Sequence, residues 1–176
     1  MSTQNKNRRR TFELVLFSML GALMFASKII MEILPNIHLI GMFIVTFTVV
    51  FRWKALYPIY IFVFITGLYS GFAPWWIPYL YIWTGLWGIA MLVPKSAPKK
   101  AAIIIYPLIS ALHGITYGIL YAPIQALLFG LDFNGMIAWI IAGFPFDLIH
   151  GISNLITGFL IIPFSDLIKK ILQKSY

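Results

Sequence analysis

The chain has 176 residues, of which 61% are hydrophobic and 10% charged, and its formal net charge is +8. A soluble domain has roughly half apolar and a quarter charged residues, so this composition is typical of a polytopic membrane protein. At about 20 residues per spanning helix, the length allows about six or seven spans. It leaves no room for a soluble catalytic or nucleotide-binding domain, and the sequence has no cysteine for disulfide or thiol chemistry.

Six hydrophobic runs predict an all-α integral membrane protein with six transmembrane helices. The first run has no small-residue cleavage site and continues to Leu34, so we expect a retained span rather than a signal peptide. The last run is too long for one helix, and we expect Gly143 and Pro145 to divide it, with a short interfacial helix at residues 136–142. The predicted segments are a cytoplasmic N-terminus at residues 1–11, a membrane domain at 12–168 with spans at 12–34, 37–51, 55–72, 75–93, 101–129 and 145–168, and a cytoplasmic C-terminus at 169–176.

The basic residues predict the orientation. Twelve of the thirteen Lys and Arg lie before the first span, between spans two and three, between four and five, and after the sixth. The alternate connections contain none, which is the positive-inside pattern of a plasma-membrane protein with both termini in the cytoplasm. This placement also explains the positive net charge without a nucleic-acid partner.

The segment FPFDLIHGISNLITG sets three polar side chains within an apolar run. Asp147, His150 and Asn154 are spaced i, i+3 and i+7, so they share one helical face. We place Asp147 and His150 in the first outer turns of span six. Two interpretations follow: a structural hydrogen-bond stripe between helices, or, as we favour, the polar wall of a solute pocket open to the outside.

Other polar and aromatic side chains fall in the same outer half of the membrane. Trp76, Tyr79 and Trp83 recur at roughly helical spacing and form either an interfacial aromatic belt or a face that stacks on a flat heterocycle. Lys28 and Glu32 are spaced for an intrahelical ion pair, and Lys28 is also a candidate contact for a charged solute. The remaining candidate solute contacts at the rim are Gln125 and His38.

Several other chemistries are disfavoured by the sequence. A metal site built from His113, Asp147 and His150 would require residues about two turns apart in depth, and no HExxH or cysteine pattern is present. We therefore expect no metal and no cofactor. An intramembrane enzyme using Asp147 and His150 remains an alternative, but no nucleophile is evident beside them. No GxxxxGK[ST] motif is present, so the chain does not hydrolyse ATP by itself.

The first span carries a second candidate surface. Ser18, Ala22 and Ala26 recur every four residues and form a smooth strip for close helix packing. The strip fits either the chain's own helices or a separate membrane partner.

Together these features resemble the substrate-binding S component of an energy-coupling factor transporter. The resemblance rests on the basic N-terminus, six spans, the outer polar residues, and the Ser18/Ala22/Ala26 run, which is similar to the family's Ala-xxx-Ala motif. It implies a non-enzymatic subunit that captures a vitamin or related micronutrient near the outer face. It also implies docking through the first helix onto a transmembrane coupling protein joined to two cytoplasmic ATPases.

The resemblance leaves the solute open. Residue 2 is Ser, without the N-terminal Met-His pattern of the cobalt and nickel members, which disfavours a metal-ion substrate. Pantothenate, folate, cobalamin, and pyridoxine-like or queuine-like compounds remain compatible. A ligand-free assembly subunit is the second alternative to the uptake function.

Overall fold

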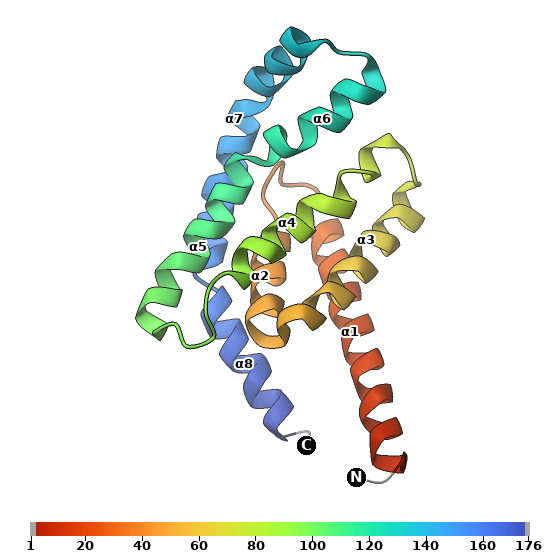
Figure 1. Cartoon of the computed structure of the whole chain (residues 1–176), viewed down its shortest axis with the longest axis vertical. Helices are drawn as coiled ribbons and strands as arrows, with labels where there is room; N and C mark the ends of the chain where they lie inside the picture. The colour runs from red at the N-terminus through yellow and green to blue at the C-terminus, as the bar shows by residue number, and fades with distance from the viewer. Residues whose placement is uncertain (1–2, 175–176) are drawn as a thin grey trace.

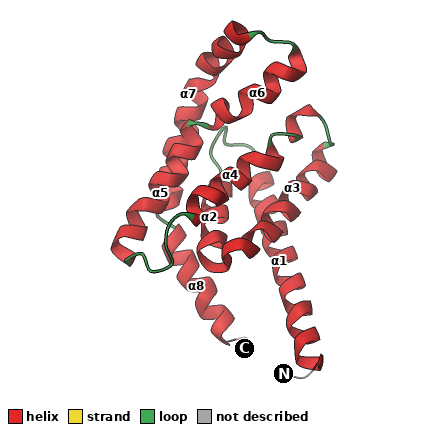
Figure 2. Cartoon of the chain, viewed as in Figure 1, coloured by secondary structure: helices red, strands yellow, loops and turns green. Residues whose placement is uncertain are grey.

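The computed structural model describes residues 3–174, and every regular element in that range is a helix (Figure 2). The α-helices are α1 (Thr3–Met31), α2 (Ile40–Phe51), α3 (Leu56–Ser70), α4 (Tyr79–Met91), α5 (Lys99–Ile115), α6 (Tyr117–Phe129), α7 (Phe133–Gly158) and α8 (Ile161–Lys174). Two short 3-10 helices, η1 (Arg52–Ala55) and η2 (Pro74–Trp76), precede α3 and α4. The prediction of an all-α protein is therefore confirmed.

Four helical stretches are long and apolar enough to cross a membrane. These are Gln4–Met31, Ile40–Ser70, Lys99–Phe129 and Phe133–Gly158. Within the second stretch the chain reverses direction at η1, where Arg52 has a positive φ of 56°, so α2 and α3 point opposite ways (Figure 1). The fold thus defines a membrane-embedded helical protein, with α2, α3 and α4 as shorter helices beside the long ones.

Helix α2 forms the centre of the molecule. Residues 40 to 48 are all buried, and α2 contacts α4, α5, α7 and α8 (Figure 1). The hydroxyl of Thr48 donates to the carbonyl oxygen of Ile44 at 2.7 Å, so this polar group is satisfied inside the helix. A helix that is apolar all round is the kind that a protein buries, and α2 provides the core on which the other helices pack.

The basic clusters gather at one end of the molecule. The two described ends of the chain, the turn at η1 and the connection between α4 and α5 all lie toward the lower end in Figure 1. The connections between α1 and α2, α3 and α4, and α6 and α7 lie toward the other end. Twelve of the thirteen Lys and Arg belong to the lower set, so the charge separation predicted from the sequence is matched by the fold.

The predicted helix break at Gly143 and Pro145 is wrong. Helix α7 continues through both residues from Phe133 to Gly158, and the separate interfacial helix at 136–142 does not form. A proline removes one backbone hydrogen bond, but long apolar helices tolerate this when neighbouring groups satisfy the backbone. The chain breaks later instead, at residues 159–160, so the predicted span 145–168 is divided between α7 and α8.

The predicted span 101–129 also contains a break, at Thr116 between α5 and α6. The backbone N–H of Gly118 donates to Oδ2 of Asp147 on α7 at 3.1 Å. Because a side chain on another helix satisfies this donor, α5 does not need to continue regularly into α6. The break lets α6 lean away from α5 (Figure 1).

Candidate functional site

All three histidines of the chain lie together in the folded protein, although they come from different segments. His38 is in the connection between α1 and α2, His113 is on α5, and His150 is on α7. The ring centroids of His38 and His150 are 4.5 Å apart. Trp83 on α4 joins the set, with its ring centroid 6.4 Å from His38 and 5.8 Å from His113. No local sequence relationship accounts for this convergence; it is produced by the packing of α4, α5 and α7 around α2.

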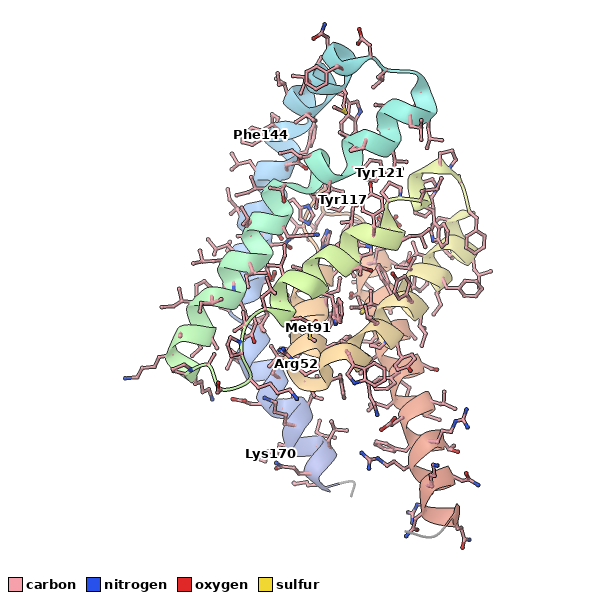
Figure 3. The ribbon with its side chains drawn as sticks, viewed as in Figure 1. Arg52, Met91, Tyr117, Tyr121, Phe144 and Lys170 are labelled. Atoms are coloured by element: carbon pink, nitrogen blue, oxygen red, sulfur yellow. The ribbon has the colours of Figure 1, made fainter. Side chains whose placement is uncertain are left out.

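Two tyrosines complete the group. Tyr79 packs edge-on against Trp83 at 5.4 Å, and Tyr117 lies 5.8 Å from Trp83 and 5.1 Å from His150. Figure 3 labels Tyr117 where α6 begins, toward the end of the molecule opposite the termini. We refer to the following six residues as the histidine–aromatic cluster: His38, Tyr79, Trp83, His113, Tyr117 and His150.

The cluster contains buried polar atoms without partners. Among the residues that the structure describes, no hydrogen-bond partner is available to Nδ1 of His38, Nε1 of Trp83, Nδ1 of His113 or Nε2 of His150. Each such group costs about 1–3 kcal/mol when it is buried unpaired. Of the eight buried side-chain nitrogen and oxygen atoms without a partner in the described residues, four lie in this cluster, and a bound polar solute there would provide partners for them.

The hydrogen-bonding character of two of these atoms is fixed. Nε2 of His113 lies 3.1 Å from the carbonyl oxygen of Ile82, which only accepts, so Nε2 carries the proton and donates. In the neutral ring Nδ1 is then an acceptor, whereas the indole N–H of Trp83 is a donor. The cluster therefore offers both a donor and an acceptor beside aromatic faces, which suits a small, flat, polar molecule.

Close packing of α5 against α7 positions the cluster. A Cβ atom added to Gly114 would lie 2.8 Å from the Cα of Gly151, so the two backbones meet with no side chain between them. Nδ2 of Asn154 donates to the carbonyl oxygen of Ser110 at 3.1 Å and fixes the register one turn away. His113 and His150 are thereby brought to the same level.

The structure gives Asp147 and Asn154 connecting roles. Asp147 accepts from the backbone of Gly118, and Asn154 holds the carbonyl of Ser110, so both side chains join α7 to neighbouring segments. Because α7 begins at Phe133, Asp147 lies nearly four turns inside it. The placement of Asp147 and His150 in the first outer turns of a helix is therefore wrong.

The other predicted solute contacts divide into two groups. His38, Tyr79 and Trp83 belong to the cluster. Trp76 instead donates its Nε1–H to the carbonyl oxygen of Val63 at 2.8 Å. Lys28 forms the expected ion pair with Glu32 at 3.3 Å. Gln125 lies on α6, partly buried, about two turns beyond Tyr117.

Sequence reasoning missed Tyr117 and placed His113 too deep. The placement of His113 about two turns from His150 followed from starting the last helix at Pro145 rather than at Phe133. A signal was present: His113, Tyr117 and Tyr121 recur at four-residue spacing and thus share one face if the helix is continuous. Within residues 3–174, no group of three or more His, Asp or Glu has the arrangement of a metal site.

Comparison of the chain with protein-family models, with curated proteins and with solved structures returns no match. The fold and the site define the class: a membrane-embedded helical protein with a buried histidine–aromatic cluster.

Proposed function

We propose that this chain is the solute-capture subunit of an ATP-driven uptake system, binding a vitamin or related micronutrient in the histidine–aromatic cluster. The observation that carries the proposal is the set of four buried, unpartnered polar atoms among aromatic rings. The chain contains no nucleotide-binding motif, so a separate coupling protein and its ATPases would supply the energy.

The proposed topology has six passes with both termini in the cytoplasm. It is supported by the gathering of the basic clusters at one end of the fold, which the positive-inside rule assigns to the cytoplasm (Figure 1). Helices α2, α3 and α4 have 12, 15 and 13 residues and are each shorter than the usual span of about 20. The burial of α2 inside the protein makes its short length compatible with a pass.

A panel of water-soluble vitamins titrated onto the purified protein in detergent tests the function. We expect one member to bind tightly and saturably in calorimetry without being converted, and native mass spectrometry to detect it as a co-purified molecule. Conversion to a product would instead identify the intramembrane enzyme, in which Asp147 and His150 act as acid and base. Absence of both binding and turnover would favour an assembly subunit and contradict the proposal.

The outward face of α1 is the proposed docking surface for the coupling protein. Helix α1 packs on α3 through Phe17, which stacks on Tyr57, and through Gly21, which lies against Ile61; Met24 on the same face of α1 is buried too. Ser18, Ala22 and Ala26 are exposed on the other side, so the chain's own helices do not cover them. A groove of about 570 Å³ adjoins this face and is lined by Ser18, Trp53 and Tyr57.

Replacing Ala22 with tryptophan is expected to leave solute binding within about twofold of the wild type and to reduce cellular uptake at least tenfold. The indole would project from an exposed position and prevent close approach of a partner helix. Leu23→Trp is the matched control because Leu23 is also exposed but lies about 100° away around the helix. Normal uptake by Ala22→Trp would exclude docking at this face.

A further inference from the structure

A second candidate binding site lies at the opposite end of the molecule from the histidine–aromatic cluster. A cavity of about 370 Å³ opens between α2, α5, α8 and the connection from α4 to α5. Its wall carries four cations, which are Arg52, Lys95, Lys99 and Lys169, and one carboxylate, Asp166. The cavity therefore has a formal excess of three positive charges.

Two of the four cations have structural partners. The guanidinium of Arg52 donates to the carbonyl oxygens of Met91 at 2.7 Å and Val93 at 3.2 Å, which ties the turn after α2 to the end of α4 (Figure 3). Lys99 forms an ion pair with Asp166 on α8. A guanidinium has five N–H donors, so Arg52 is held in place with three donors still available.

The other two cations have no such role. Among the described residues, neither Lys95 nor Lys169 has an ion-pair partner or a side-chain hydrogen bond, although both line the cavity. Lys95 comes from the connection before α5, and Lys169 from α8. Lys95 and Lys169 are exposed, and together with the fixed guanidinium of Arg52 they offer an anion in the cavity several charge-assisted hydrogen bonds.

Apart from the hydroxyl of Tyr106, the rest of the wall is apolar. Val49, Ala102 and Ile162 line the same cavity, and Ala102 and Ile162 are buried. A free inorganic anion would make no use of these side chains. A molecule that carries a phosphate next to a hydrocarbon chain would contact both parts of the wall.

We propose that this cavity binds the phosphoryl head group of an anionic phospholipid, with the start of an acyl chain against the apolar wall. Basic pockets between transmembrane helices are a recurring solution for such head groups. The arrangement does not depend on the histidine–aromatic cluster or on the solute, since the two sites lie toward opposite ends of the fold (Figure 3).

The proposal is tested by native mass spectrometry of the detergent-purified chain. The protein is titrated with anionic phosphatidylglycerol or with zwitterionic phosphatidylcholine of identical acyl chains. We expect tighter binding of phosphatidylglycerol and, for the Lys95→Gln/Lys169→Gln variant, a loss of that affinity on the order of 30-fold, about fivefold for each lysine. Inorganic phosphate at millimolar concentration should not displace the lipid.

The matched control is Lys100→Gln/Lys170→Gln, which removes the same charge outside the cavity wall, from the first turn of α5 and from α8. Its affinity for phosphatidylglycerol should stay within about twofold of the wild type. Equal losses in both double variants, equal binding of the two lipids, or displacement by inorganic phosphate would each overturn the proposal. A thermal unfolding curve for each variant verifies that the protein remains folded.

Discussion

Replacing His150 with phenylalanine is expected to weaken solute binding by about 10- to 100-fold while raising the stability of the solute-free protein. Phenylalanine retains a flat ring against His38 and Tyr117 but removes Nε2, which is buried and unpartnered. Removing such a group relieves a desolvation cost of about 1–3 kcal/mol in the free protein. The same change leaves a polar group of the bound solute unpaired, and about 1.4–2.8 kcal/mol corresponds to the stated loss of affinity.

The opposite signs of the two effects distinguish a binding role from a structural one. If His150 served only packing, phenylalanine would leave binding unchanged, and alanine would destabilise the protein through a cavity. Calorimetry measures the affinity, and thermal unfolding without solute measures the stability. His150→Gln supplies an amide N–H and carbonyl oxygen in place of the ring nitrogens and should preserve more of the affinity than phenylalanine does.

Trp83→Phe provides an independent test at the same site. It should likewise weaken binding, because the indole N–H is the one atom among the four without partners that can only donate. Trp53→Phe is the control, since Trp53 is exposed on η1 at the other end of the fold. Binding that is reduced equally by both substitutions would show that the effect is not specific to the cluster.

The composition and charge pattern were sufficient to predict the helical class and the gathering of basic residues at one end. Both follow from physical rules that act along the chain: apolar runs avoid water, and lysine and arginine avoid crossing the bilayer. A local signal for the start of α7 was present but not used: Asp132 caps that helix by accepting from the backbone N–H of Gly135 at 2.7 Å.

The start of α7, and with it the depth of its polar side chains, could not be predicted in the same way. A proline within a helical pattern usually ends or kinks the helix, but α7 continues through Pro145. That difference of twelve residues in the helix start moves every polar side chain of α7 to another depth. It also conceals the meeting of His113 with the other two histidines, which depends on the contact between Gly114 and Gly151 rather than on any local pattern.

The contact between α5 and α7 leads to the second large effect. Gly114→Ala is expected to lower the free energy of unfolding by about 2–3 kcal/mol, because the added Cβ would lie 2.8 Å from Cα and 2.9 Å from the backbone N of Gly151. These are backbone atoms of another helix and cannot rotate aside, so the helices must separate. Separation would also displace His113 relative to His150, so solute affinity should fall together with stability.

Gly143→Ala is the matched control, because it makes the same chemical change within α7 where a Cβ would meet nothing within 4 Å. Alanine is favoured over glycine in a helix interior by about 1 kcal/mol, so this variant should be as stable as the wild type or more stable. The two substitutions thus have opposite expected signs in denaturant or thermal unfolding. If Gly114→Ala proved neutral, α5 and α7 would not be in backbone contact. The explanation of how His113 and His150 reach the same level would then be wrong.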